Sequence, residues 1–225
     1  MNYKIALDGP SGAGKSSLAK LIAAKLGITY VDTGAMYRSI GLYIKQQGID
    51  PNDNDAVIRA LPDIRLAIRF ENGEQHIYLC DSDVGDSIRT PEISMYASRV
   101  SAIPEVRTFL LDTQRNLAKE SSVIMDGRDI GTVIFPDAEV KIFLTASIEA
   151  RAKRRVLELQ AKGMSVTYDE VLNDMKLRDK NDSEREVAPA VAAEDAVLLD
   201  NSLLDMDGTV QAALKIIQEK LLIAR

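Results

Sequence analysis

The chain has 225 residues, enough for one domain with a small insert, and its 46% hydrophobic and 28% charged residues are ordinary for a globular protein. A formal net charge of −6 argues against nonspecific binding to polymeric nucleic acid or to an anionic membrane. With Cys80 as the single cysteine there is no intrachain disulfide, and no apolar run approaches the ~18 residues that span a bilayer. The first predicted strand has no signal peptide before it, so we expect a cytoplasmic protein without a membrane partner.

A glycine-rich loop follows the first predicted strand, residues 3–8, without a gap and leads straight into a helix. It fits G-x-x-x-x-G-K-[ST] in the strand, loop and helix context that this pattern requires. Glycine lets backbone N–H groups turn toward a triphosphate, and the helix N-terminus adds the positive end of its dipole. We predict that Lys15 reaches the β and γ phosphates of ATP and that the Ser16 hydroxyl ligates Mg²⁺. The predicted ATP-binding residues are Gly9, Pro10, Ser11, Gly12, Ala13, Gly14, Lys15, Ser16 and Ser17.

The segment after the loop alternates helix, strand and helix. Gly27 ends the first helix, a short strand follows over residues 28–31, and Asp32 and Thr33 open a second helix over residues 34–47. This alternation predicts a parallel sheet with helices on both faces. The apolar residues expected on the buried face of the first helix are Leu18, Leu21, Ile22 and Leu26. Those of the second helix are Met36, Ile40 and Ile44.

Residues 62–90 break the alternation. Apolar residues at 64, 66, 68 and 70 alternate with polar or small ones, and Glu71-Asn72-Gly73 carries a hairpin signal before a returning strand at 76–79. A third short strand at 83–84 would complete a small antiparallel insert. His76, the only histidine, is interpreted as a solvated strand residue, because no triad or metal partners surround it.

The remaining chain returns to helices and short apolar strands. Helices are predicted over 90–102, 104–119, 147–162 and from a capping box at Thr167 and Glu170 to about 182. Further strands are predicted at 122–126, 140–145 and 196–200. The last helix carries an apolar stripe at Val210, Leu214, Ile217 and Leu221. The predicted fold class is therefore α/β, a three-layer fold with five parallel strands flanked by helices.

Ligands of an open parallel sheet bind beyond the carboxyl ends of its strands, so the residues after each strand are candidates for a site. Asp126 ends an apolar run in the position of a Walker-B aspartate, which predicts a second Mg²⁺ ligand; a helix or turn cap is the alternative. Phosphoryl transfer spreads negative charge that planar guanidinium groups bind bidentately. Arg128 has the strongest position, beside Asp126, among five candidate arginines: Arg38, Arg107, Arg128, Arg178 and Arg185.

The basic stretch from Arg151 to Arg155 allows three interpretations: a solvated helix face, a nucleic-acid patch or a lid over donor phosphates. The acidic chain and the lack of interleaved aromatic residues disfavour nucleic acid. A lid would exclude water and so protect ATP from simple hydrolysis, and we favour it over a solvated face.

Several stretches together resemble one family, the bacterial cytidylate kinases. The phosphate loop is shared by many kinases, but residues 32–38, of the form D-[ST]-G-A-x-Y-R, and 126–136, of the form D-G-R-D-x-G-T-V-x-F-P, are far more specific. Departures are small: Thr33 stands where some relatives have serine, and Ser16-Ser17 replaces Gly-Thr. The set is completed by Ile88-Arg89-Thr90, Arg178-Asp179, Asp182-Ser183-Glu184-Arg185 and Ala188-Pro189, so the resemblance covers essentially the whole chain.

The resemblance implies transfer of the γ-phosphoryl group of ATP to CMP or dCMP, with Mg²⁺, in a single P-loop kinase domain of the nucleoside-monophosphate-kinase fold over residues 1–225. It divides the chain into a core (1–61, 91–150 and 183–225), a CMP-side insert at about 62–90 and a lid at about 151–166. We expect a monomer.

The resemblance also implies roles for single residues. Thr33, Arg38 and Arg128 look like ligands of the acceptor phosphate. Ser98, Arg107, Asp129 and Arg185 look like ligands of cytosine, and Arg178 and Asp182 like ribose contacts. Arg154 and Arg155 look like lid residues that meet the donor phosphates, and with Lys15 and Arg128 they form the expected catalytic set. No general base is expected, because a CMP phosphate oxygen is already anionic.

Two other classes of protein remain open. Another small-molecule phosphate-loop kinase is disfavoured only by the resemblance. A regulatory GTPase should carry N-K-x-D, which Asp179-Lys180-Asn181-Asp182 does not fit, and a motor ATPase usually has an acidic Walker-B pair, whereas Gly127 follows Asp126.

Overall fold

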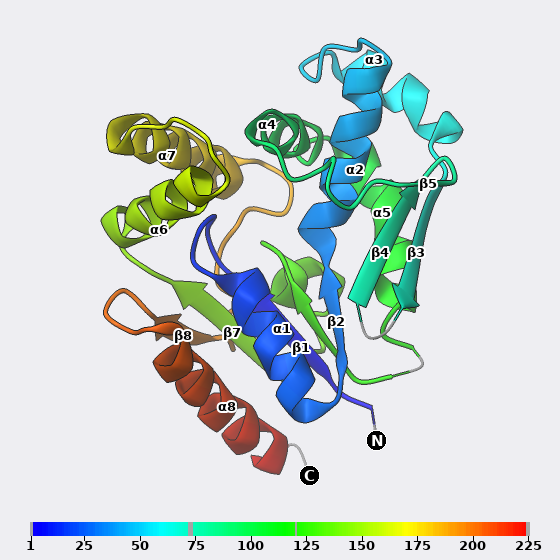
Figure 1. The fold of residues 1–225 in the computed structure, drawn as a ribbon. Helices are drawn as coiled ribbons and strands as arrows, with labels where there is room; N and C mark the ends of the chain where they lie inside the picture. Colours follow the sequence, from blue (N-terminus) through cyan, green and yellow to red (C-terminus); the bar gives the residue numbers. More distant parts are fainter. Residues whose placement is uncertain (1, 72–73, 120, 224–225) are drawn as a thin grey trace.

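Five parallel strands form the central sheet of the computed structural model, which describes residues 2–71, 74–119 and 121–223 (Figure 1). The strand order is β2-β6-β1-β7-β8. Asp126 of β6 is in register with Leu7 of β1 and Asp32 of β2, so the carboxyl ends of these strands align at one edge. The predicted fold class is confirmed. The strands are β1 (Lys4–Asp8), β2 (Thr29–Asp32), β6 (Val123–Asp126), β7 (Val140–Thr145) and β8 (Val197–Asp200).

Helices cover both faces of the sheet, because successive residues of a strand point to opposite sides. In β1, Ile5 and Leu7 join an apolar cluster with α1 (Lys15–Leu26) and α8 (Met206–Ile223), which lie side by side in Figure 1. Ala6 joins the cluster on the other face, built with α2 (Thr33–Gln46), α4 (Pro91–Val100) and α5 (Pro104–Asn116). Burial on both faces explains why the strands are nearly continuous apolar runs.

The buried face of α1 differs from the predicted one. Leu21 is 40% exposed, so its place in the predicted stripe was wrong. Small alanines on the side away from Leu21 allow close packing on the sheet and rotate the buried face toward them. The buried apolar residues of α1 are Leu18, Ala19, Ile22 and Ala23. The stripes of the other two helices are confirmed, with Met36, Ile40 and Ile44 buried in α2, and Val210 and Ile217 buried and Leu214 and Leu221 partly buried in α8.

The insert is a three-stranded antiparallel sheet of β3 (Leu66–Glu71), β4 (Glu74–Leu79) and β5 (Ser82–Asp83). Asn72 and Gly73 of its predicted turn lie outside the described residues. Ile64 does not belong to the first strand as predicted, but is buried after a 3₁₀ turn, Leu61–Asp63. Because β4 lies beside α2 and β2, the insert packs on the β2 edge of the central sheet.

Two helices, α6 (Ile148–Ala161) and α7 (Tyr168–Glu184), pack on each other beside the sheet (Figure 1). The predicted capping box of Thr167 and Glu170 is present at the start of α7. The predicted lid, residues 151–166, covers most of α6 and the turn after it. The apolar contacts instead join α6 to α7 as one unit. Their shared cluster of buried residues is Ala152, Leu159, Val171 and Met175.

Three local features differ from the sequence-based expectation. A short helix, α3 (Asn54–Ala60), was not predicted, although Asp53 caps it by accepting from the Ala56 N–H group. A π-helical turn, Ile130–Ile134, follows β6. α5 ends at Asn116, before the predicted end at residue 119. In the part of the chain that the structure describes, no helix has the length and apolar character to cross a bilayer.

Candidate active site

A cavity of about 530 Å³ opens at the carboxyl ends of β1, β2 and β6. Its walls come from the phosphate loop, the start of α2, α4, the segment after β6, and α6 and α7. The loops and helix ends beyond the strands converge there, as expected for a ligand site of an open parallel sheet. All nine residues predicted for the acceptor side line it: Thr33, Arg38, Ser98, Arg107, Arg128, Asp129, Arg178, Asp182 and Arg185.

The phosphate loop depends on glycine at two points. At Gly9, where φ is +146°, an added Cβ would lie 2.0 Å from the Leu144 carbonyl oxygen. Gly14, at φ +92°, is the N-cap of α1, so only a residue without Cβ starts the helix in this direction without strain. Lys15 is buried and donates from Nζ to the Pro10 carbonyl oxygen at 2.7 Å. Burial and the nearby Arg128 lower the Lys15 pKa to about 7.

The two predicted metal ligands lie next to each other. Ser16 Oγ donates to Asp126 Oδ2 at 2.8 Å, and the Tyr30 hydroxyl donates to Asp126 Oδ1 at 3.0 Å. Burial and the nearby Asp32 carboxylate raise the Asp126 pKa to about 6. A buried carboxylate beside a hydroxyl, at the mouth of an anion-binding loop, is a donor set that fits Mg²⁺, which prefers oxygen ligands and keeps several waters.

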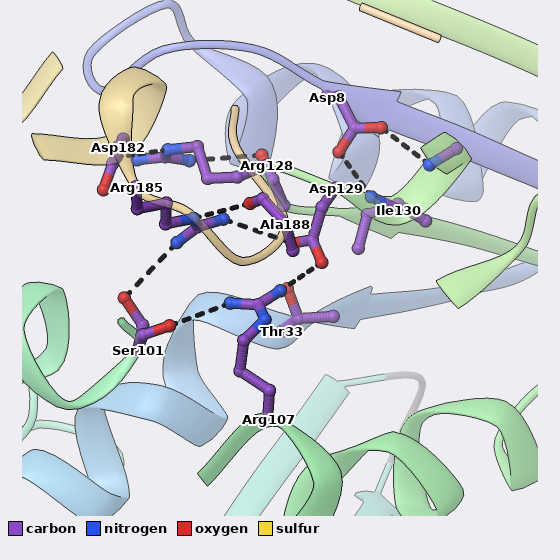
Figure 2. Close-up of polar contacts among 12 residues, drawn as sticks. Asp8, Thr33, Ser101, Arg107, Arg128, Asp129, Ile130, Asp182, Arg185 and Ala188 are labelled. Atoms are coloured by element: carbon purple, nitrogen blue, oxygen red, sulfur yellow. Dashed lines mark hydrogen bonds and ion pairs between the residues drawn. The ribbon is translucent and has the colours of Figure 1, made fainter. Parts of the chain in front are cut away.

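A buried cluster of one carboxylate and two arginines also lines the cavity (Figure 2). Arg107 donates from Nη2 to Asp129 and from Nη1 to the Ser101 carbonyl oxygen at 3.0 Å. Arg185 Nη2 lies 3.7 Å from the other Asp129 oxygen, and its Nε donates to the Ala188 carbonyl oxygen. Burial and the Arg107 charge lower the Arg185 pKa. These contacts fix the guanidinium donors and the carboxylate acceptor where they line the cavity.

Three of the other arginines that line the cavity belong to the predicted acceptor side, and two of these three have carboxylate partners. Arg128 Nε donates to Asp182 Oδ2 at 2.9 Å, and Arg38 Nη2 donates to Asp32 Oδ2 at 2.9 Å. Within the described residues, Arg178 Nε is buried without a hydrogen-bond partner. Burial and the nearby Arg128 lower the Arg178 pKa to about 10. A buried, unpaired guanidinium nitrogen is costly, and an anionic ligand would relieve that cost.

The Gln75 amide joins the insert to the predicted acceptor side. Gln75 of β4 accepts from the Asp32 N–H group at 2.8 Å and donates to the Asp32 carbonyl oxygen at 3.2 Å. The Asp32 carboxylate in turn accepts from the Ala35 N–H group as the N-cap of α2. Through Asp32, the position of the insert is therefore coupled to Arg38. At the same edge, Thr33 Oγ1 donates to the Asp126 carbonyl oxygen at 2.8 Å.

The predicted lid arginines line the cavity from α6. Arg154 donates to the Asn201 carbonyl oxygen at 2.7 Å, and Asn201 Nδ2 donates to the Ala13 carbonyl oxygen of the phosphate loop at 3.0 Å. Arg155 pairs with Glu158 at 2.8 Å on the same helix. Arg151 is buried, donating to the Ser11 carbonyl oxygen at 2.9 Å and pairing with Asp179 of α7 at 2.7 Å. In this conformation, α6 is tied to the loop that it was expected to cover.

Several residues that order the site were not among the predicted site residues. Asp8, Asp32, Ser101 and Asn201 contact predicted site residues or their neighbours. Asp8, Asp32 and Asn201 end a strand or directly follow one, where the rule for parallel sheets had already placed candidates for a site. Ser101 sits at the end of α4, and nothing in its local sequence marks it.

Comparison with known proteins identifies the family. The family model described as "Cytidylate kinase" matches residues 5–219, nearly the whole chain. The chain belongs to the cytidylate kinase family. Members of this family are nucleoside monophosphate kinases, so the chain is an enzyme of that class.

Curated relatives match nearly the full length of the chain. The chain is 49% identical over 220 residues to the cytidylate kinase of Thermosipho melanesiensis, covering 98% of this chain and 99% of the relative. It is 50% identical over 212 residues to that of Caldicellulosiruptor saccharolyticus, covering 94% of each. Among solved structures, an uncharacterized protein from Eubacterium ventriosum matches 97% of this chain and 99% of its own with a TM-score of 0.52 and 16% identity, a likeness of fold alone.

Proposed function

We propose that this member of the cytidylate kinase family transfers the γ-phosphoryl group of ATP to CMP or dCMP, giving ADP and CDP or dCDP. The observation that carries the proposal is one cavity with two unlike walls. The phosphate loop and Lys15 line one, and the cluster of Arg107, Asp129 and Arg185 lines the other. Such a cavity suits two nucleotides that meet through their phosphates. Action as a monomer in the cytoplasm is part of the proposal.

The donor nucleotide is assigned to residues 9–17. The free N–H groups at the start of α1 and the positive end of its dipole favour a triphosphate there. Lys15 Nζ, now on the Pro10 carbonyl oxygen, would move to the β and γ phosphates. The phosphate charge would restore the protonated form that burial disfavours.

Mg²⁺ is assigned to Ser16 and Asp126. Bound there, it would offset the charge of the donor phosphates. Tyr30, which donates to the same carboxylate, would keep Asp126 oriented toward the loop.

The acceptor phosphate is assigned to Thr33, Arg38 and Arg128, and the ribose to Arg178 and Asp182. Bringing two anionic nucleotides together needs a surplus of cations, since their repulsion grows as the distance falls. The Asp182 contact orients the Arg128 guanidinium and leaves other donors for a phosphate oxygen. Catalysis then consists of positioning and electrostatic stabilisation, without a general base.

Base selection is assigned to Asp129 with Ser98, Arg107 and Arg185. A carboxylate only accepts hydrogen bonds, so Asp129 suits the amino group of cytosine and repels the carbonyl oxygen that uracil has there. Ser98 Oγ is buried without a partner among the described residues, which supports a ligand contact at this point.

The lid is assigned to α6 together with α7, with Arg154 and Arg155 facing the donor phosphates. The shared apolar cluster supports movement of both helices as one unit. Closure would exclude water and so favour transfer over hydrolysis.

The test is phosphoryl transfer from Mg-ATP to CMP, dCMP, UMP, AMP and GMP, with shikimate and a reaction lacking an acceptor as controls. Turnover confined to CMP and dCMP, and lost on removal of Mg²⁺ by EDTA, is the expected result. ATP hydrolysis that does not depend on an acceptor would instead favour an ATPase.

A further inference from the structure

Asp8 is a buried carboxylate to which none of the steps above gives a role. It ends β1 directly before the phosphate loop and is 4% exposed. Its Oδ1 accepts from the Ile130 N–H group and its Oδ2 from the Gly131 N–H group, both at 2.8 Å (Figure 2). The two oxygens therefore contact the segment that directly follows Arg128 and Asp129.

The segment needs such an acceptor. Ile130 and Gly131 begin the π-helical turn, and the first N–H groups of a helical turn have no partner within it. A buried N–H group without a partner is costly, so the Asp8 carboxylate caps the turn from a different strand. Asp129, which carries the cluster that faces the base, is the residue immediately before this turn.

Other contacts leave the segment little room to move. A Cβ on Gly131 would lie 3.1 Å from Lys141 Cδ and 3.4 Å from Asp8 Oδ2. The Gly127 N–H group donates to the Leu7 carbonyl oxygen of β1 at 3.1 Å. Both ends of residues 127–131 are thus attached to the strand that leads into the phosphate loop.

We propose that Asp8 is a positioning residue, which fixes Arg128 and Asp129 relative to the phosphate loop and thereby sets acceptor binding and base choice. The inference rests on the proposed role of Asp129 in reading the base. Asp8 touches neither nucleotide in this scheme and acts through the backbone of Ile130 and Gly131.

The test compares steady-state kinetics of Asp8→Asn with those of the wild type. The amide keeps the shape but turns an N–H donor toward one of the two backbone N–H groups. We expect the preference for CMP over UMP in kcat/KM to fall about tenfold and the KM for CMP to rise, because small displacements of a reading group are costly. The KM for ATP should stay within about twofold.

Asp53→Asn is the matched control, since Asp53 also caps a helix by accepting from a backbone N–H group but lies outside the cavity lining. It should leave the CMP preference unchanged. An Asp8→Asn enzyme with the wild-type preference and KM for CMP would overturn the inference, as would an effect on the KM for ATP alone.

Two further arms separate the possible failures. Wild-type enzyme that does not phosphorylate CMP would overturn the proposed function and this inference with it. An Asp129→Ala enzyme with unchanged preference would show that the base is read elsewhere and would likewise remove the basis for the role of Asp8. If Asp8→Asn does not fold, amide exchange of the wild type decides: Ile130 and Gly131 should exchange slowly, and exchange as fast as in exposed loops would contradict the contact.

Discussion

At the scale of single residues, two arginines surround one carboxylate in the part of the cavity that is proposed to bind the acceptor. Little solvent reaches these three side chains. The side chains of Arg107 and Asp129 are 9% and 5% exposed, and that of Arg185 is 7% exposed. Removing such groups from water costs several kcal/mol per ion, so a buried ion-pair cluster is weak support for stability. Its retention in the cavity wall fits a role in binding, for which the polar edge has to be preorganised.

Arg128→Ala should reduce turnover far more than affinity for ATP. In the proposed function the side chain would offset charge in the transition state on the acceptor side, and loss of one such donor costs about 10²–10³ in kcat. The measurement is kcat with saturating CMP together with the dissociation constant for ATP. Arg128→Lys keeps the charge without the planar fork and should recover only part of the loss. Collapse of ATP binding, with transfer per bound ATP intact, would contradict the assignment.

Asp129→Ala should relax the choice between CMP and UMP. Without the carboxylate, nothing in that position repels the uracil carbonyl oxygen, and the neighbouring Arg107 and Arg185 lose their common partner. Breaking a buried charge cluster on one side costs about 3–5 kcal/mol, so the thermal midpoint should fall as well. Relative kcat/KM values for CMP and UMP, with the melting curve, measure both effects. A preference that survives the substitution would show that other residues read the base.

At the scale of elements, α6 and α7 form a unit with an apolar cluster separate from the two clusters of the sheet. Arg151 connects this unit to the phosphate loop through the Ser11 carbonyl oxygen. A unit with its own core can move without disturbing the sheet, which is what a lid requires.

Leu159→Ala should loosen this helix pair while the sheet remains folded. Leu159 is 6% exposed in the cluster of the helix pair, and a buried leucine cut to alanine costs about 2–5 kcal/mol. We expect the substitution to accelerate amide exchange in α6 and α7 more than in β1 and β6, and to increase ATP hydrolysis in the absence of an acceptor. Leu157→Ala is the matched control, because Leu157 is on the same helix and 67% exposed. Equal acceleration throughout the sheet would argue against a separate unit.

At the scale of the whole molecule, stability depends on charges that the fold buries. Burial raises the Asp8 pKa to about 6, against the opposing effect of its two backbone hydrogen bonds. The Asp129 charge also raises this pKa, and the Lys15 charge lowers it. Lys141, on the neighbouring β7, directs its charge to Asp195 instead. Because the folded-state pKa exceeds the usual 3.8, the folded protein binds more protons than the unfolded chain between about pH 4 and pH 6.

The stability difference between wild type and Asp8→Asn should therefore depend on pH. The contribution of Asp8 is fully present below its unfolded pKa and is lost as the pH rises through about 6, whereas asparagine does not titrate. A shift of about two pKa units corresponds to about 3 kcal/mol. Denaturant unfolding of both proteins from pH 4 to pH 8 should show the wild-type advantage shrinking by about this amount. A constant difference would mean that Asp8 keeps an ordinary pKa in the folded state.

Local sequence predicted the strand ends well because each strand is a short apolar run bounded by glycine or by polar residues. It predicted the wrong face for α1, where Leu21 has the expected spacing but Ala19 and Ala23 permit closer packing. The missed helix α3 is only seven residues long, so packing decides it more than propensity does. The packing of α6 on α7 was not predicted, because the apolar residues on the face of one helix do not identify the helix that covers them.

The family resemblance implied most residues of the acceptor side. The sequence by itself determined the strand, glycine loop and helix around Lys15, and the parallel sheet. These follow from local backbone freedom and apolar periodicity, which neighbouring residues control. Only the tertiary structure decided which charges pair: Arg107 contacts Asp129 across 22 residues of chain, and Arg128 contacts Asp182 across 54. It also brought Asp8 to Ile130 across 122 residues. The order of the strands and the burial of the site determine which charged groups pair. A charge removed from water is stabilised only when the folded core places an opposite charge or a hydrogen-bond partner beside it.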